Sequence, residues 1–396
     1  MIVKILVCNA GSTSLKFKFY EMPECTLYAQ GHVERVGSTD DAVFHYTNCI
    51  DDIRVNLDRQ CIPTYREGIE MFLGYLTGKT PAVMEDGSQK TIGVISDITE
   101  IERCGFKTVL SKGHFGIHEL DEETMQGMRD WFALAPVHNA AYLNTIETMR
   151  DALPDALFVG VFETAFHQTI PLERKLYGIP YEWYEKYGIQ RLGYHGASHG
   201  YIADNLNEMA IAAGRVDAEG KPKYKAISCH LGGSCSICAI EDGKSVDTSF
   251  GMSLETGVIH ANRVGEMDSS IPYFLESEGL SREEILKGCQ KNGGLLGISG
   301  VSNDLRYVLE AANEGNERAA LARDVFVTNI AHYIGRFFVD LGGLDYLVFT
   351  AGIGEHSEEI RDAVYDKVKC LGIDKSQVLV IPTNEEIGIA RRTYEY

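Results

Sequence analysis

The sequence predicts an α/β protein that consists of two large domains with a duplicated core. Its 396 residues suffice for two domains, or at most three, at about 150 residues each. An apolar strand followed by a glycine turn occurs three times along the chain. In two of these copies, aligning Cys8 on Cys229 also brings Gly11 onto Gly232. We therefore expect each of these copies to open its domain with a hairpin whose turn faces a common cleft.

The three copies differ in the element that comes after the turn. In the first copy, residues 3–9 and 15–21 have strand patterns, and the polar segment AGSTS joins them. The second copy, residues 224–246, repeats strand, glycine turn and strand, and has a further turn at Asp242-Gly243. The third copy, residues 345–364, has the pattern of a buried strand, a glycine turn and an amphipathic helix.

Helices are predicted between these copies. Residues 121–135 begin with acidic side chains and end before a proline, as helices commonly do. Residues 281–290 begin with Ser281, and Glu284 stands three residues later, which is the spacing of a capping box. Residues 316–341 form a long amphipathic pattern that ends at a pair of glycines. The pattern thus alternates strands and helices, which is typical of α/β proteins.

Charge narrows the possible partners. Lys and Arg total 37 against 57 Asp and Glu, a net charge of -20. Such an acidic surface repels phosphate backbones and anionic membranes, so we expect no nucleic acid and no membrane partner. The chain also lacks a signal-peptide pattern and an apolar run long enough for a membrane span, so we expect a cytoplasmic protein. An anionic ligand must then be held by a few local cations and backbone N–H groups.

The ten cysteines predict buried thiols rather than disulfides, because several lie inside apolar runs. Cys235 and Cys238 have the spacing C-x-x-C. Both lie in a predicted strand, where residues three apart point to opposite faces. We therefore do not expect a redox or zinc site there.

The segment NAGSTSLK, residues 9–16, is a candidate phosphate turn. Its small residues allow the backbone to approach a ligand, and its hydroxyls and Lys16 can bind phosphate oxygens. Asn9 is placed to hold a cation or its water. An ordinary hairpin turn is the alternative. The chain has neither a P-loop motif nor a dinucleotide-binding motif followed by a helix.

Three further polar residues stand in turn-like surroundings. His195 lies before Gly196 and four residues before His199, so it is either a donor to a phosphoryl oxygen, half of a zinc site, or a hydrogen-bonded buried histidine. Arg263 can stabilise the charge of a transferring phosphoryl group, or it is a lone surface arginine. Glu385 comes after a buried-strand pattern and can hold a metal-bound water or cap a helix.

Together these segments resemble the acetate kinase family over essentially the whole chain. The matching segments occur in the order of the family: NAGSTSLKF, LAPVHNAA, VFETAFHQTIP, YEKYGI with GYHGASH, ISCHLGG, LLGISGVSND, FTAGIGE and IPTNEE. The resemblance implies two duplicated ribonuclease H-like domains of the actin-like ATPase fold, with a cleft between them. The implied bounds are residues 1–165 for the N-terminal domain and 166–385 for the C-terminal domain, which binds nucleotide and forms the dimer. The helix 386–396 is expected to rejoin the first domain.

The resemblance also implies an activity. Members catalyse the Mg²⁺-dependent (or Mn²⁺-dependent), reversible transfer of a phosphoryl group between ATP and a short-chain carboxylate, which gives ADP and an acyl phosphate. They are usually homodimers. The expected partners are therefore a small carboxylate, a nucleotide and a second copy of this chain.

Residue roles are implied in the same way. The catalytic residues at the transferring phosphoryl group are Lys107, His138, Glu163, His195 and Arg263. The metal-site residues are Asn9, Glu163 and Glu385. The substrate pocket consists of Lys107, Val109, Val137, Tyr194 and Leu254. The phosphate and nucleotide contacts are Asn9, Ser12, Ser14, Lys16, His230, Gly232, Gly233, Ser234, Asp304, Arg306, Gly352, Ile353, Gly354 and His356, with Ser302 and Asn303 nearby.

The chain departs from the family at positions that matter for specificity. Lys107 stands for a substrate-binding Arg, and a lysine lacks the bidentate fork that an arginine offers a carboxylate. Glu163 stands for an Asp, and Gly233 for an Asn in the second phosphate turn. Further changes affect the acyl pocket and the adenosine site: Tyr194 for Phe, Leu254 for Pro, Val137 for Leu and His356 for Asn. These departures predict an acyl substrate shifted away from acetate.

Two alternatives belong to other functional classes. One is a nucleotide-binding regulator that has lost turnover, which the changes at Lys107, Glu163 and Gly233 suggest. The other is a kinase of a hydroxyl acceptor, for which Asp247 or Glu255 is a candidate base.

Overall fold

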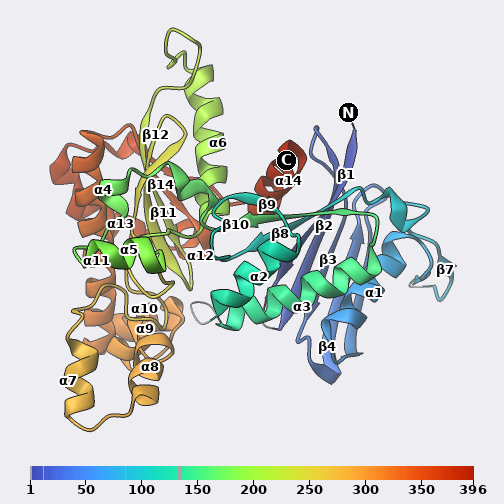
Figure 1. The fold of residues 1–396 in the computed structure, drawn as a ribbon, viewed down its shortest axis with the longest axis horizontal. Coiled ribbons are helices and arrows are strands. Elements are labelled where there is room, and N and C mark those ends of the chain that lie inside the picture. Colours follow the sequence, from blue (N-terminus) through green and yellow to red (C-terminus); the bar gives the residue numbers. More distant parts are fainter. Residues whose placement is uncertain (1, 12, 85, 133–135) are drawn as a thin grey trace. The chain divides into compact units, whose positions relative to one another are not determined.

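The computed structural model describes residues 2–11, 13–84, 86–132 and 136–396, except for the side chains of residues 136–138. The chain forms two compact units (Figure 1). Unit 1 is Met1–Ala165 with Asn384–Tyr396, and unit 2 is Phe166–Thr383. The chain leaves unit 2 at Asn384, two residues before the expected boundary. Asn384 is the N-cap of the last helix, since its side chain accepts a hydrogen bond from the Ile387 backbone N–H.

The described part of unit 1 contains an eight-stranded sheet with the order β5-β4-β3-β2-β1-β8-β10-β9. Its strands are β1 (Val3–Ala10), β2 (Ser14–Met22), β3 (Thr26–Glu34), β4 (Ser38–Asn48), β5 (Ile53–Ile62), β8 (Arg103–Thr108), β9 (Ile117–Glu119) and β10 (Leu157–Phe162). Strands β1 to β5 are antiparallel neighbours, whereas β8 runs parallel to both β1 and β10. A small separate hairpin consists of β6 (Ala82–Val83) and β7 (Gln89–Lys90).

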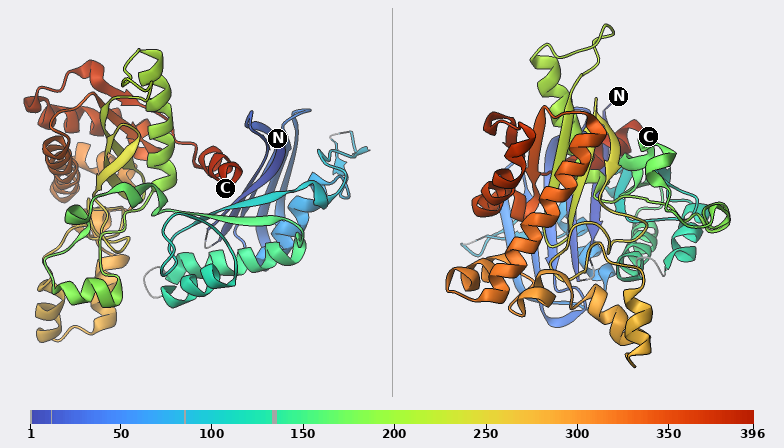
Figure 2. Two further views of the ribbon diagram at one scale, coloured as in Figure 1. Left: turned by 45° about the horizontal axis from the view of Figure 1, so that its top comes forward. Right: turned by 90° about the vertical axis from the view of Figure 1, so that its left-hand side faces the viewer.

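Helices cover both faces of this sheet (Figures 1 and 2). On one face lie α1 (Tyr65–Leu76) and α3 (Pro136–Ala152), and α2 (Glu122–Asp130) packs on α3. The Phe17 ring in β2 stacks on Phe72 of α1, with centroids 4.4 Å apart. On the other face lies α14 (Glu385–Glu395), the red helix beside the blue strands. A Cβ at Gly105 of β8 would collide with Thr393, so glycine permits this helix to lie close to the sheet.

Unit 2, which is described throughout, contains a five-stranded sheet with the order β13-β12-β11-β14-β15. Its strands are β11 (Lys225–Leu231), β12 (Cys235–Glu241), β13 (Lys244–Thr248), β14 (Tyr346–Thr350) and β15 (Val378–Val380). One face packs on α10 (Leu305–Asn313), α11 (Glu317–Leu341) and α13 (Glu358–Val368), and the other packs on α6 (Gly196–Ala212). The remaining helices are α4 (Leu172–Lys175), α5 (Tyr181–Tyr187), α7 (Ile271–Ser277), α8 (Arg282–Gln290), α9 (Gly294–Ser299) and α12 (Ala351–His356).

The two sheets share one topology, so the predicted duplication is confirmed. Three antiparallel strands followed by two parallel ones occur in the order β3-β2-β1-β8-β10 in unit 1 and β13-β12-β11-β14-β15 in unit 2. The register agrees as well. Cys8 pairs with Phe106 across the first parallel contact, and its counterpart Cys229 pairs with Phe349. This is the arrangement of a ribonuclease H-like fold present twice.

Local predictions can be compared element by element. The capping box at Ser281 and Glu284 is confirmed, and α8 begins at the next residue. Helix α2 ends at Asp130, earlier than expected, and residues 133–135 of the predicted helix lie outside the described residues. The third glycine turn was predicted wrongly, because the backbone goes directly from β14 into α12 at Ala351.

The cysteines are free thiols. Cys235 and Cys238 are buried in the cores on opposite faces of the unit 2 sheet, as their spacing in a strand predicted. Among the described residues, no helix is long and apolar enough to cross a membrane.

Candidate active site

The strand ends of unit 1 bring four of the predicted site residues to one face of the sheet. Lys107 pairs with Val161 across β8 and β10, so Glu163, two residues further on, extends from the same face. Cys8 pairs with Phe106 across β1 and β8, so the next residues along these parallel strands, Asn9 and Lys107, are neighbours. Asn9 also pairs with Lys16 on β2. These polar residues therefore gather where the carboxyl ends of parallel strands meet.

Lys107 joins two acidic residues on this face. Its Nζ lies 2.6 Å from Glu163 Oε1 and 2.7 Å from Glu385 Oε2. Glu385 is the first residue of α14, which covers the same face. Burial lowers the pKa of Lys107, but the two carboxylates outweigh burial and hold this pKa well above its ordinary value. The side chain predicted to receive a substrate carboxylate thus holds two carboxylates of the protein.

The first phosphate turn is a tight hairpin. The Gly11 N–H donates to the Ser14 carbonyl at 2.8 Å, and the Tyr65 hydroxyl donates to the Gly11 carbonyl at 2.7 Å. A Cβ at Gly11 would come within 2.6 Å of the Ser14 hydroxyl, so a larger residue here would require Ser14 to change its rotamer. Ser12, which was predicted to bind phosphate, lies outside the described residues.

His195 lies at the start of α6 with left-handed backbone torsions, φ 58° and ψ 27°, which agrees with the turn predicted before Gly196. Its Nδ1 is 2.8 Å from the Ser236 hydroxyl, and that hydroxyl is also 2.8 Å from His199 Nε2. The second nitrogen of His199 is 3.0 Å from Ser228. The two histidines are therefore linked through the Ser236 hydroxyl, and both nitrogens of His199 contact serine hydroxyls, which disfavours the half zinc site.

The second phosphate turn adjoins this histidine. The His195 ring stacks on His230 with centroids 4.0 Å apart, and His230 Nδ1 is 2.8 Å from the Ser198 hydroxyl. The Gly232 N–H donates to the Ser234 carbonyl, which closes the turn between β11 and β12. A Cβ at Gly233 would meet no atom within 4 Å. Glycine at this position, where an Asn was expected from the resemblance, therefore leaves open space.

Behind the site, two buried histidines are held neutral. Burial lowers the pKa of His167 to about 4 and puts the pKa of His199 well below its ordinary value. His167 Nε2 donates to the Tyr194 carbonyl at 2.9 Å, so Nδ1 of the neutral ring accepts from the Ser245 hydroxyl. These contacts fix the backbone that carries Tyr194 and His195.

We expect this arrangement to make unit 2 sensitive to acid. The unfolded state binds protons at His167 below about pH 6.5, whereas the folded state does so only near pH 4, so stability falls as the pH drops through this window. Between pH 7.5 and 5, His167 alone accounts for about 2 kcal/mol. Urea unfolding of wild type and His167→Gln at both pH values checks this. The variant should lose less stability on acidification, and an exposed control, His332→Gln, should match the wild type. Equal losses of stability on acidification in all three proteins would contradict the role of His167.

Arg263 lies in the loop after β13. Its Nη1 donates to the Leu254 carbonyl at 2.6 Å. Burial lowers the pKa of Arg263, yet an arginine at neutral pH remains a cation because its ordinary pKa is far higher. Gly294, with φ +61°, lets the start of α9 pass close to this loop, since a Cβ there would collide with the backbone of His260 and Arg263. The arginine expected at the phosphoryl group therefore has a fixed backbone.

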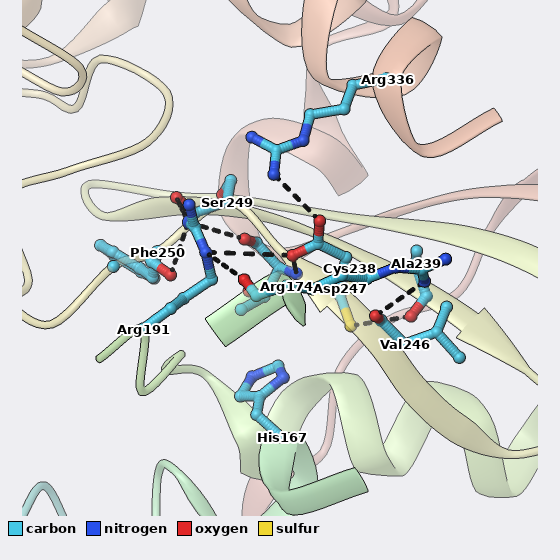
Figure 3. A network of polar contacts seen from close by, with 12 residues as sticks. His167, Arg174, Arg191, Cys238, Ala239, Val246, Asp247, Ser249, Phe250 and Arg336 are labelled. Atoms are coloured by element: carbon cyan, nitrogen blue, oxygen red, sulfur yellow. Dashed lines mark hydrogen bonds and ion pairs between the residues drawn. The ribbon is translucent and has the colours of Figure 1, made fainter. Parts of the chain in front are cut away.

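A buried carboxylate organises the loop before Arg263 (Figure 3). Asp247 is 1% exposed; its Oδ2 lies 3.1 Å from Arg336 Nη2 and its Oδ1 lies 4.0 Å from Arg191 Nε. Burial raises the pKa of Asp247, and the two arginines oppose this. Arg191 Nη1 donates to three successive carbonyls, those of Thr248, Ser249 and Phe250. Asp247 thus supports the loop through Arg191, and its burial disfavours a role as catalytic base.

Sequence reasoning did not assign Arg191, Arg336 or Ser236 to the site. The signal for Ser236 was its place between Cys235 and Ile237 on β12, because it lies on the face of the strand opposite to these two apolar residues. Nothing in the local sequence distinguishes Arg336, because it lies on the long helix α11.

The residues of the expected acyl pocket belong to both units. In unit 2, Tyr194 is buried, its hydroxyl donates to the Met252 carbonyl at 2.5 Å, and its ring meets Phe250 edge to face. Leu254 is partly buried on the same loop. In unit 1, Val109 is buried at the end of β8. Val137 and His138 lie in α3, and their side chains are outside the described set.

Unit 2 also contains a cavity of about 890 Å³. This volume is within the range of small-molecule sites. Its walls come from the second phosphate turn and the starts of α10 and α12, and the lining residues are Gly232, Gly233, Ala261, Asn303, Asp304, Leu305, Arg306, Leu309, Gly352, Ile353, His356 and Ser357. Asp304 caps α10 and forms an ion pair with Arg306. His230, Ser234 and Gly354 are not among the lining residues.

Two ribonuclease H-like sheets of the same topology, with a glycine turn at each first hairpin and a cavity of small-molecule size in unit 2, define a protein of the actin-like ATPase fold. The profile of the Acetokinase family matches residues 4–387. The acetate kinase of Bacillus subtilis is 38% identical over 412 residues, with 98% of each chain covered. The chain therefore belongs to the acetate kinase family, and it is a phosphotransferase with a carboxylate acceptor.

Solved structures agree with this membership. The acetate kinase of Porphyromonas gingivalis has a TM-score of 0.82 at 33% identity, and 99% of each chain is covered. The propionate kinase of Francisella tularensis has a TM-score of 0.84 at 30% identity, with the same coverage. Neither the regulator nor the hydroxyl-directed kinase is favoured by these relatives.

Proposed function

We propose that this chain transfers a phosphoryl group between ATP and a short-chain carboxylate other than acetate. Two features of the structure carry this proposal. Unit 2 contains a cavity large enough for a nucleotide, and unit 1 contains a cluster of Lys107, Glu163 and Glu385 at its strand ends. Relatives named acetate kinase and propionate kinase support the carboxylate class. The changed acyl-pocket residues Tyr194, Leu254 and Val137 support the shift away from acetate.

The chemistry requires little from the protein beyond positioning and charge. A carboxylate is ionised at neutral pH, so its oxygen can attack the phosphorus in line without a general base. Arg263 stabilises the charge on the phosphoryl oxygens, and His195 and His138 donate hydrogen bonds to them. Lys16 and the two glycine turns hold the remaining phosphates. The fixed backbones of Arg263 and His195 support these roles, because positioned donors need no reorganisation during the reaction.

We also propose a Mg²⁺ or Mn²⁺ site at Glu163, Glu385 and Asn9. The donor set fits such an ion, since carboxylate and amide oxygens are its preferred protein ligands. The position of the Lys107 ammonium between the two carboxylates supports a place for a cation there. When bound, the metal would neutralise phosphate charge.

An acid panel tests the proposed function. The wild-type enzyme with ATP, Mg²⁺ and hydroxylamine should form hydroxamates from at least one acid in a series from formate to isobutyrate, and a larger acid should exceed acetate in kcat/KM. Formation of no hydroxamate from any acid would contradict the carboxylate assignment. Preference for acetate would contradict only the shift in substrate.

The cavity of unit 2 is proposed as the nucleotide site, with Gly352 and Ile353 beside the adenosine and His356 near its base. A Cβ at Gly352 would meet no protein atom within 4 Å, so a side chain there would project into space proposed for the nucleotide. We expect Gly352→Gln to raise the KM for ATP about tenfold or more, which corresponds to about 1.4 kcal/mol. Gly288→Gln is the control, because Gly288 also has open space but lies outside the cavity. Steady-state kinetics with unchanged KM for ATP would contradict this placement.

The assembly and location are proposed in the same way. Family membership supports a homodimer in the cytoplasm. Light scattering of the purified chain at several concentrations should give twice the chain mass of 43.9 kDa. A mass of one chain throughout would contradict the dimer.

A further inference from the structure

Lys107 is a departure from the family that has an unexpected place in the structure. Its ammonium contacts both carboxylates of the proposed metal site at 2.6 and 2.7 Å. The side chain of Lys107 is 16% exposed, and those of Glu163 and Glu385 are 5% and 16% exposed. The three charges are therefore largely removed from water and stabilise one another.

A metal ion and this ammonium compete for the same oxygens. A metal at these glutamates, bound directly or through a water on Glu385, would draw on the carboxylate oxygens that Nζ now contacts. Two cations beside the same pair of carboxylates repel strongly in a poorly solvated site. The ammonium must therefore leave the two carboxylates when the metal binds.

The chemistry of lysine suits such a displacement. Its ammonium is a compact charge on a flexible four-carbon stem, whereas the planar guanidinium of an arginine makes paired, directional bonds to carboxylates. Once displaced, the ammonium of Lys107 is available to an anionic substrate. The same side chain can then hold the carboxylates in the absence of metal and a substrate in its presence.

We propose that Lys107 is an internal counter-cation of the metal site: it lowers the affinity for divalent metal, and metal binding releases it toward the carboxylate substrate. This proposal rests on the proposed metal site. Metal binding frees Lys107 for the carboxylate substrate, and a bound substrate keeps Lys107 away from the two glutamates. Each ligand therefore increases the affinity of the protein for the other.

Metal binding without nucleotide tests the proposal directly. Free Mn²⁺ is measured by electron paramagnetic resonance during titration of the purified full chain, for wild type, Lys107→Met and Lys107→Gln. Lys4→Met is the matched control, since it removes one positive charge from an ion pair elsewhere in unit 1. We expect both Lys107 variants to bind Mn²⁺ at least about tenfold more tightly than wild type, and the control to be unchanged. Affinities equal to that of the control, or weaker than wild type, would overturn the proposal.

Folding of the variants is also informative. Removal of the ammonium leaves two carboxylates without their cation, so a variant that folds only with Mn²⁺ would support the proposal, since the metal then replaces the ammonium. A variant that remains unfolded at saturating Mn²⁺ would contradict it. Hydroxamate formation by the wild type separates this proposal from the proposed function. If acyl phosphate forms but the Mn²⁺ affinities do not differ, only the role of Lys107 fails.

Discussion

Replacement of Arg263 with alanine is expected to lower kcat about 10³-fold while the chain remains folded and still binds ADP. Phosphoryl transfer spreads negative charge over the equatorial oxygens, and an arginine that meets this charge contributes about 10³-fold or more to the rate. Arg263 is suited to this task because its guanidinium is mostly buried and anchored to the Leu254 carbonyl. The contribution arises chiefly in the transition state, so ground-state binding of the nucleotide should change little.

The measurement is kcat with a saturating acid identified from the panel, together with ADP binding by calorimetry. Arg282→Ala is the matched control, because Arg282 is exposed at the start of α8. Circular dichroism excludes unfolding as the cause. A loss of less than tenfold in kcat for Arg263→Ala would remove this residue from the catalytic centre.

The second large effect is on stability. We expect Asp247→Ala to lower the free energy of unfolding of unit 2 by about 3 kcal/mol, because removal of one partner of a buried ion pair leaves the other charge uncompensated. Breaking a buried ion pair typically costs about 3–5 kcal/mol. We expect the low end of this range because Arg336 is 45% exposed and can be solvated. Arg191 is 15% exposed and also loses this partner, so the three carbonyls of the loop after Asp247 are held less firmly.

Urea unfolding followed by circular dichroism checks this value. Asp324→Ala is the control, because Asp324 forms an exposed ion pair with Arg323 and should change stability by about 0.5 kcal/mol or less. Rescue in part by Asp247→Asn would show that hydrogen bonding, and not charge alone, fixes the loop. A change for Asp247→Ala no larger than that of the control would contradict the role of this carboxylate.

The sequence predicted the elements that depend on local patterns. The first hairpin, the second hairpin and the capping box at Ser281 result from alternation, glycine turns and residue spacing. The duplication was predicted from the alignment of Cys8 with Cys229, and the shared topology of the two sheets confirms it. The start of α12 at Ala351 was missed, because closely spaced glycines and an alanine are as typical of a turn as of a short helix.

The contacts within the candidate site were beyond sequence reasoning for a physical reason. Lys107 and Glu385 are 278 positions apart, and their ion pair depends on how closely α14 packs over Gly105. Similarly, Asp247 was a candidate base for a hydroxyl acceptor because the residues around it in the sequence do not reveal its ion pairs with Arg191 and Arg336. Residue type and spacing identify candidates, whereas long-range packing decides what each candidate touches.

Attack of a carboxylate oxygen on the phosphorus of a nucleotide, the central step of the proposed reaction, is tested most directly by isotope transfer. The wild-type enzyme is incubated with ATP, Mg²⁺ and the preferred acid labelled with ¹⁸O in both carboxylate oxygens, and the product is observed by ³¹P nuclear magnetic resonance. We expect an acyl phosphate whose phosphorus signal is shifted by one bridging ¹⁸O. Release of unlabelled phosphate without any acyl phosphate signal would contradict this step.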